Sequence, residues 1–319
     1  MWSYLVRRIL QGLFILFIIT LVCFSLTSLA SDPMSQYATK QGMTQADREA
    51  LRHSLGLDQP VPVQYLIWLK LALQGNLGIS FFSKQPVLLM ISQRLPMTLI
   101  LMITAEIFIV IISLLLSLIS AMRQYSFLDN LITSFSFIGY SMPIFFIALG
   151  CIAIFAVQFK AWGLPYLPTG ADIWNPKDPI AMIRHLILPV FCLVVIQTAG
   201  YSRFLRTSIL EVLGMDYVRT ARAKGLTHRV VLFKHALRNA ILPFVTIVGL
   251  DIPFLLGGAL VTESIFAWPG MGRLFWEYAE RGDYPVVNGV LLLTSAAVVF
   301  FTIVVDMAYT LVDPRIRLD

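Results

Sequence analysis

Six long apolar blocks with few charged side chains constrain the fold of this chain more than any other feature. At 1.5 Å per residue, a helix needs about 20 apolar residues to cross the ~30 Å hydrocarbon core of a bilayer. The blocks are long enough or nearly so, and the fourth is the shortest. They predict six transmembrane helices, at roughly 9–30, 97–121, 131–157, 186–202, 241–266 and 287–311.

Composition favours an all-α integral membrane protein and excludes a large soluble core. Charged residues make up 13% of the chain, whereas soluble domains carry about 25%. Cys23, Cys151 and Cys192 lie inside apolar blocks, so we expect them to behave as small hydrophobic residues. The sequence has no CxxC or HExxH motif, and none of its four histidines has a neighbour that would form a triad. We therefore expect no catalytic residue and no metal site.

The first apolar block has two interpretations. It follows Arg7 and Arg8, and residues 28–30 (Ser-Leu-Ala) resemble a signal-peptidase site. A cleaved signal peptide is therefore one interpretation. However, 22 uncharged residues exceed the 7–15 residues of a typical signal core. We favour a retained membrane anchor.

The distribution of basic residues predicts the orientation of the chain. With the amino terminus inside, the cytoplasmic loops hold 13 of the 24 Lys and Arg residues. Because cytoplasmic loops carry an excess of Lys and Arg, both termini are expected in the cytoplasm. These loops lie at residues 1–8, 122–130, 203–240 and 312–319.

The largest external segment is residues 31–96. Thr44 is a predicted N-cap and Gly56 a predicted helix end, and a second apolar run follows at 65–73. We expect two short helices on the outer surface rather than an independent domain. The chain thus divides into residues 1–96, the first span with this external segment, and residues 97–319, a five-helix core with the cytoplasmic loop 203–240.

Helix-breaking residues in the fifth span are candidates for a transport pathway. Gly249, Pro253 and Gly257 recur at intervals of four. Such breaks are tolerated where neighbouring helices or a watery cavity satisfy the freed backbone groups. They fit either ordinary helix packing or a flexible helix that lines a pathway.

Four acidic residues lie within or at the edge of the spans, namely Glu106, Asp251, Glu263 and Asp306. A charge at mid-bilayer costs at least ~2.5 kcal/mol, so these side chains are expected to face protein or water. No Lys or Arg within a span pairs with them in a readable way. We favour structural or cavity-lining roles over a proton relay, and take Glu106 and Asp251 as pathway candidates.

Residues 203–240 hold eight Lys and Arg against two acids, which equals the whole formal charge of +6. Within them, Asp216 is a predicted N-cap and Gly225 a predicted helix end, with Gly214 upstream. A two-turn helix is unstable alone in water. We expect its basic face to bury little against its own protein. Either a partner groove orders it, or it is a structured loop without a partner.

The motifs of this segment resemble a known family. Residues 217–226 (YVRTARAKGL), followed by 235–243 (HALRNAILP), are similar to the coupling loop of binding-protein-dependent ABC permeases. The resemblance is closest to the dipeptide, oligopeptide and nickel branch, and to the first permease subunit of the pair. Where the wider superfamily begins Glu-Ala-Ala, this chain has Arg219-Thr220-Ala221. Six further motifs match in order, at 55–60, 75–80, 140–143, 266–272, 283–286 and 313–317.

The resemblance implies a six-helix type I importer permease fold in a bacterial inner membrane. It implies that the short helix docks on a cytoplasmic ATPase, whose closure drives alternating access for a peptide, glutathione, or a nickel or metal chelate. The expected coupling residues are Asp216, Tyr217, Arg219, Thr220, Ala221, Ala223, Lys224 and Gly225.

The expected partners follow from the same resemblance. They are a second homologous permease subunit, two ATPase subunits, an extracytoplasmic substrate-binding protein and the bilayer, with no nucleic acid. The chain has no GxxxxGK[ST] motif and thus no phosphate cradle of its own. We expect it to bind no cofactor and to catalyse nothing, with ATP and Mg²⁺ held by the partner ATPases.

Three rival functions are weighed against this one. An ion-gradient-driven secondary transporter is favoured by inverted internal repeats, and no convincing repeat relates the two halves. An intramembrane hydrolase needs a nucleophile with a base, or metal ligands. A purely structural scaffold has no need for a basic helix bounded by glycines.

Overall fold

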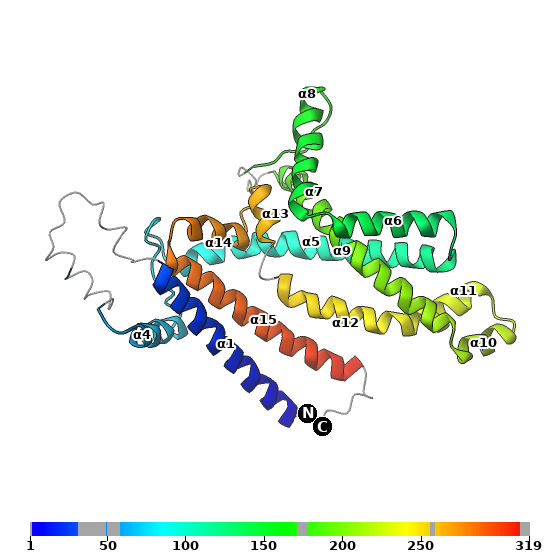
Figure 1. Ribbon diagram of the computed structural model, residues 1–319, viewed down its shortest axis with the longest axis horizontal. Helices are drawn as coiled ribbons and strands as arrows, with labels where there is room; N and C mark the ends of the chain where they lie inside the picture. Colours follow the sequence, from blue (N-terminus) through cyan, green and yellow to red (C-terminus); the bar gives the residue numbers. More distant parts are fainter. Residues whose placement is uncertain (1, 31–48, 50–57, 171–177, 256–258, 313–319) are drawn as a thin grey trace. The chain divides into compact units, whose positions relative to one another are not determined.

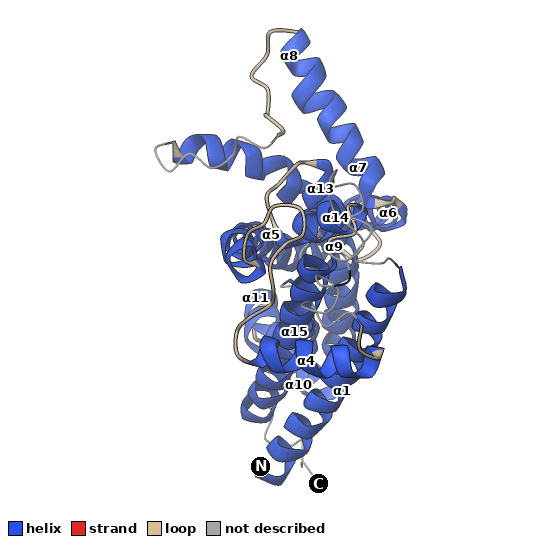
Figure 2. Cartoon of the chain, turned by 90° about the vertical axis from the view of Figure 1, so that its left-hand side faces the viewer, coloured by secondary structure: helices blue, strands red, loops and turns tan. Residues whose placement is uncertain are grey.

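The computed structural model describes residues 2–30, 49, 58–170, 178–255 and 259–312. Within these ranges the regular structure is helical apart from an isolated bridge between Ile79 and Pro86. Figures 1 and 2 show the helices and the loops that join them. The predicted helix between Thr44 and Gly56 lies outside the described residues.

The helices are α1 (Trp2–Ala30), α4 (Val61–Leu73), α5 (Val87–Met122), α6 (Phe127–Ser141), α7 (Ile144–Cys151), η1 (Ile152–Gln158), α8 (Phe159–Ala161), α9 (Pro179–Leu213), α10 (Asp216–Ala223), α11 (His228–Val230), η2 (Val231–Ala236), α12 (Leu237–Leu255), α13 (Leu260–Ile265), α14 (Met271–Glu280) and α15 (Tyr284–Val312). Six stretches are long and apolar enough to cross a membrane, which confirms the predicted number of spans. They are Leu5–Ser28, Val87–Met122, Ile144–Ala161, Pro179–Leu213, Val231–Asp251 and Tyr284–Met307.

The third predicted span, 131–157, is wrong as a single helix. The chain breaks between α6 and α7, where Met142 takes an extended conformation with φ −80° and ψ 128°. It precedes Pro143, and a residue before proline is driven out of the helical region by the proline ring. The span runs instead through α7, η1 and α8, and α6 is a separate helix.

The fourth and fifth spans also differ from their predicted bounds. The fourth, expected at 186–202, is part of the 35-residue helix α9, which starts where Asp178 accepts a hydrogen bond from the Ala181 amide (3.0 Å). Polar residues that end an apolar block do not end a helix, so α9 continues to Gly214. The fifth, expected at 241–266, ends with α12, and α13 follows as a separate short helix.

The chain packs as two compact units, of residues 1–98 with 269–319 and of residues 99–268. In the first unit, α1 and α15 run antiparallel and lie side by side in Figure 1. Gly12 permits the close approach, because a Cβ there would lie 2.6 Å from Val299 Cγ1. The domain boundary predicted after residue 96 comes from the organisation of the sequence and stays a prediction. The packing instead groups residues 269–319 with residues 1–98.

The rest of the first unit is built around Asp283. Its carboxylate accepts hydrogen bonds from the Ser80 hydroxyl (2.6 Å) and the Phe82 amide (2.9 Å). This joins the segment before α5 to the start of α15, and so brings together two of the motifs noted in the sequence. A core of buried apolar residues from α5, α14, α15 and the loop before α5 supports the junction; Leu77, Val87, Met90, Ile91, Met271, Leu274, Tyr278, Val286 and Val290 form it.

In the second unit, α9 is the central helix, with α6 and α12 packed along it. Gly139 of α6 lies against α9, where an added Cβ would be 3.3 Å from the Val195 carbonyl oxygen. A smaller cluster of buried residues joins α7 to α9 and to Phe266; it contains Ala148, Cys151, Leu188 and Cys192.

Candidate functional site

Helix α10 begins one residue earlier than predicted. Met215 is the capping residue, in an extended conformation and without a side-chain hydrogen bond, and Asp216 is the first residue of the helix. The prediction that Asp216 is the N-cap is therefore wrong. Its carboxylate still lies in the first turn, where a negative charge is favourable to the helix dipole. It also lies 3.7 Å from the exposed Arg219 guanidinium.

The carboxyl end of α10 confirms the predicted glycine turn. Gly225 has φ +76°, a left-handed conformation that glycine adopts without steric cost. Its amide donates to the Arg222 carbonyl (2.9 Å), and the Leu226 amide donates to the Ala221 carbonyl (3.4 Å). This pair of bonds is a Schellman motif, which satisfies the last carbonyl groups of the helix.

The basic face of α10 is exposed, as expected, and the opposite, apolar face is buried against its own chain. Val218 and Ala221 are 0% and 6% exposed, and they pack on Val231 of η2 with Val212 and Leu213 beside them. The spacing of Val218 and Ala221, three residues apart, places both on one side of a helix. That spacing was readable in the sequence.

The predicted coupling residues thus divide between two faces. Ala221 faces its own chain, while Asp216, Tyr217, Arg219, Thr220, Ala223, Lys224 and Gly225 are exposed. Three exposed side chains that the sequence interpretation missed lie beside them, those of Met215, Arg222 and Leu226. The outer face therefore combines basic groups with apolar side chains, of which Met215 and Tyr217 are 51% and 44% exposed.

Helix α10 is tied to the fifth span. The Asn239 side-chain amide of α12 donates to the Tyr217 hydroxyl (2.8 Å). At the next residue of α12, the Ala240 carbonyl accepts a hydrogen bond from the Ser208 hydroxyl of α9 (3.0 Å). The π-helical segment η2, with Val231 and Leu232 buried, connects the two elements along the chain. Helices α10 and α12 are therefore linked both by a hydrogen bond and along the chain.

The structure brings Glu106 and Asp251 together, as two of the side chains lining one cavity of about 240 Å³. Asp251 accepts hydrogen bonds from the Tyr201 hydroxyl (2.5 Å) and the Gln197 amide (2.8 Å). Sequence reasoning missed both donors. Among the described residues, Glu106 Oε1 is buried without a hydrogen-bond partner.

The other pathway candidates are only partly described. Gly249 lies in α12, at partial exposure. Gly257 and the side chain of Pro253 lie outside the described residues. Of the remaining acids, Glu263 is fully buried in α13, and Asp306 lies 3.3 Å from Arg8. Arg8 lies just before the first predicted span, so this pair falls outside the expectation, which concerned Lys and Arg within the spans.

A buried ion pair in the second unit was not predicted. Asp129, at the start of α6, accepts two hydrogen bonds from the Arg206 guanidinium of α9 (2.7 and 2.9 Å). The Ser120 hydroxyl and the Tyr125 amide also donate to it. Arg206 first, and then these donors, lower the pKa of Asp129 to about 2 against the opposing effect of burial. This ion pair and its hydrogen bonds connect the C-terminal end of α5, the N-terminal end of α6 and the C-terminal part of α9.

Comparison with known proteins finds two family models that match the chain. The model described as "Binding-protein-dependent transport system inner membrane component" matches residues 113–318. The model for the N-terminal part of such membrane components matches residues 1–102. The first includes α10 and Asp251, and the second includes the first span and α4.

Relatives match over almost the whole length. The oligopeptide transport system permease protein AppB of Bacillus subtilis is 42% identical over 99% of this chain and 100% of its own. The glutathione transport system permease protein GsiC of Escherichia coli O6:H1 is 38% identical over 99% of each chain. The dipeptide transport system permease protein DppB of Alkalihalophilus pseudofirmus is 38% identical over 99% of this chain and 100% of its own.

Proposed function

The chain belongs to the family of inner membrane components of binding-protein-dependent transport systems, and we propose that it forms half of the pore of an ATP-driven importer. As a family member it is a multi-pass protein of a bacterial inner membrane and a permease subunit. It is not itself an enzyme, because in such systems ATP hydrolysis belongs to partner subunits.

The arrangement of α10 carries the proposal. Its inner face is held by Val218 and Ala221, and its outer face presents exposed basic and apolar side chains. Charge on such a surface steers a partner, and apolar groups at its centre supply affinity. In the proposed mechanism the outer face docks on a cytoplasmic ATPase, and closure of the ATPases displaces α10.

Transmission from α10 to the pathway follows the contacts of the second unit. The bond between Tyr217 and Asn239 and the buried part of η2 link α10 to α12. Helix α12 also carries Asp251, which lines the cavity beside Glu106. We propose that movement of α12 opens this pathway alternately to the two sides, by a rigid-body exchange of conformations.

The complete importer in this proposal contains a second homologous permease subunit, two ATPases and an extracytoplasmic binding protein. Both termini and α10 lie in the cytoplasm, as the distribution of basic residues predicts. Peptides are the proposed class of solute, with glutathione and metal chelates as alternatives. The names of three relatives support it, since they refer to oligopeptide, dipeptide and glutathione transport.

Reconstitution tests the proposal. The chain is purified with its partner subunits into lipid vesicles, and ATP hydrolysis and uptake are measured with the binding protein and a set of short peptides, glutathione and a nickel chelate. We expect one class of solute to stimulate ATP hydrolysis. When ATP is supplied on the side of the membrane that holds the ATPases, we expect that solute to accumulate on the same side. Uptake that needs no ATP and stops with an ionophore would instead establish a secondary transporter.

A further inference from the structure

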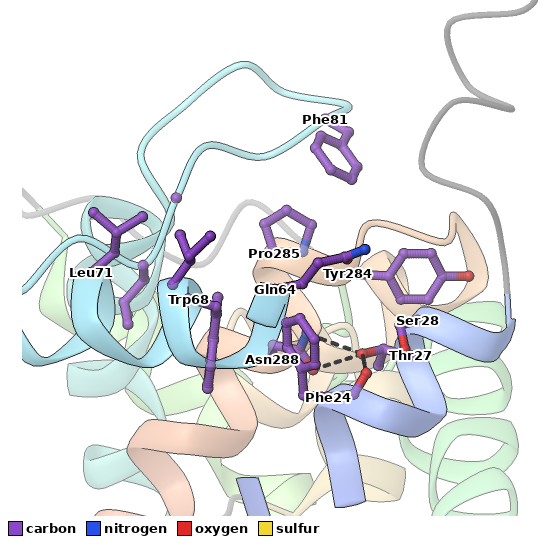
Figure 3. A pocket seen from close by; sticks show the side chains of 13 residues that line it. Phe24, Thr27, Ser28, Gln64, Trp68, Leu71, Phe81, Tyr284, Pro285 and Asn288 are labelled. Carbon is purple, nitrogen blue, oxygen red and sulfur yellow. Dashed lines mark hydrogen bonds between the residues drawn. The ribbon is translucent and has the colours of Figure 1, made fainter. Parts of the chain in front are cut away.

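The first unit contains a pocket at one end of the antiparallel pair α1 and α15 that the transport mechanism does not use. Figure 3 shows its walls. The carboxyl end of α1 contributes Phe24 and Thr27, α4 contributes Trp68, the loop before α5 contributes Phe81, and the start of α15 contributes Tyr284. The cavity has a volume of about 220 Å³.

The lining of this pocket suits a lipid chain better than a transported solute. None of its thirteen lining residues carries a charge, so nothing there pairs with the charged ends of a peptide. Its volume is below the roughly 300–1,000 Å³ of pockets that enclose a whole small molecule. The walls are mainly aromatic and aliphatic, which fits a segment of hydrocarbon.

The pocket lies at the depth where a membrane protein meets lipid head groups. Both α1 and α15 are candidate spans, and the pocket is lined by the last turns of one and the first turn of the other. Tryptophan and tyrosine are enriched at this depth, because their rings are apolar and their tips are polar. Trp68 and Tyr284 are such residues.

The pocket is continuous with the membrane-facing surface. Leu26 on α1, next to the lining residue Thr27, is 61% exposed. Helix α4 has 13 residues, too few to span a bilayer, and yet its exposed side chains are apolar except for Lys70; the apolar ones include Val63, Leu66, Ile67, Leu71 and Leu73. Ile67 and Leu71 belong both to this exposed surface and to the lining. The pocket therefore borders apolar side chains that are exposed on α4.

One donor in the pocket has no acceptor within the described part of the chain. The Trp68 indole Nε1 is buried and makes no hydrogen bond, although its ring is packed 5.6 Å from the Phe24 ring. A buried donor without an acceptor is costly. By contrast, Thr27 and Asn288 satisfy each other across the pocket floor (3.0 and 3.2 Å; Figure 3). Because this atom is buried, the Trp68 ring must turn before an oxygen atom of a ligand in the pocket can accept a hydrogen bond from it.

We propose that this pocket binds one acyl chain of a membrane phospholipid, with the ester carbonyl of that chain accepting a hydrogen bond from Trp68 Nε1. The bound lipid fills the angle between α1, α4 and α15 and fixes the short apolar helix α4 at the membrane surface. None of its lining residues belongs to α10 or lines the cavity at Glu106 and Asp251, and the proposal does not depend on the transport mechanism.

A photoreactive phospholipid tests the site in the assembled transporter. The complex is placed in bilayers of phosphatidylethanolamine and phosphatidylglycerol with a small fraction of phosphatidylcholine bearing a diazirine in one acyl chain. Adducts are mapped by peptide mass spectrometry. We expect adducts on peptides containing Phe24 and Trp68 to exceed those on the exposed face around Leu10 by about tenfold. Equal labelling of the two regions would overturn the proposal.

Matched substitutions sharpen the result. Leu71→Trp places a larger side chain in the lining, whereas Leu26→Trp makes the same change on the exposed surface outside it. Labelling of the pocket should fall about tenfold in the first variant and stay within about twofold of wild type in the second. A similar fall in both, or in neither, contradicts a bound chain.

Trp68→Phe isolates the hydrogen bond, because it keeps an aromatic wall and removes the donor. At lipid concentrations below saturation, labelling should fall about fivefold, the effect of one ordinary hydrogen bond. Unchanged labelling would refute the role of Trp68. If the substrate-binding protein, once added, abolishes labelling and crosslinks to the lining residues, the pocket is a protein docking site and the lipid assignment is wrong.

Discussion

The Gly225→Val substitution tests how far the shape of α10, rather than its charge, determines ATPase attachment. Gly225 has φ +76°, and a Cβ at this position would meet nothing within 4 Å. The added side chain therefore has room, and the backbone alone opposes it. A non-glycine residue in the left-handed region costs about 1–2 kcal/mol, and a β-branched residue is worse.

That cost falls on the Schellman end of α10. Either the turn is kept under strain, or the hydrogen bonds from Gly225 and Leu226 to the last turn open. In both cases the conformation of α10 that docks on the ATPase is disfavoured by the cost of placing valine in the left-handed region. A penalty of 1–2 kcal/mol corresponds to about a 5–30-fold increase in the dissociation constant of the ATPase. Insertion into the membrane should be unchanged, because Gly225 is exposed and lies outside the candidate spans.

The assay is binding of the purified ATPase subunits to the permease in nanodiscs, with amide hydrogen exchange at residues 222–226 as a local readout. Gly225→Asn is the matched control, since asparagine tolerates the left-handed region. We expect Asn to bind nearly as wild type does, and Val to bind more weakly with faster exchange. Wild-type affinity for Val, or equal losses for Val and Asn, would refute the backbone explanation.

Two further predictions concern stability, and both are read from thermal unfolding in detergent. Asp129→Asn leaves the Arg206 guanidinium without its charged partner in a largely buried site, so it should lower stability by about 3 kcal/mol; an unchanged unfolding temperature would refute the bracing role. Gly289→Ala places a Cβ 2.6 Å from Val87 Cγ1 and should cost about 1–3 kcal/mol by overpacking, whereas Gly150→Ala, which meets nothing within 4 Å, should be neutral or stabilising.

The features that the sequence predicted are those fixed by local physics. The number of spans follows from the thickness of a bilayer and the rise of a helix, and neither depends on how helices pack. The turn at Gly225 follows in the same way, because only glycine enters the left-handed region without strain. Each of these depends on a short stretch of chain, and the structure confirms both.

The features that were missed depend on residues distant in sequence. Apolar blocks mark where lipid is the solvent, but a helix ends only where its hydrogen bonds end. Helix α9 therefore continues through Arg203 and Arg206 to Gly214. Tyr201, within the predicted span, faces Asp251, which lies fifty residues later. No spacing rule links these two residues, so their contact required the fold.

The burial of α10 changes how its motif is understood. Residues 217–225 serve two surfaces at once, because Val218 and Ala221 hold the helix on its own protein while Tyr217, Arg219 and the residues beside them face outward. Two side chains bury little apolar area, so they stabilise an eight-residue helix only modestly. It is enough to position the helix in advance, which lowers the entropy lost on docking. In the proposed mechanism the ATPase displaces a helix that these few contacts hold, and the hydrogen bond between Tyr217 and Asn239 carries the displacement to α12.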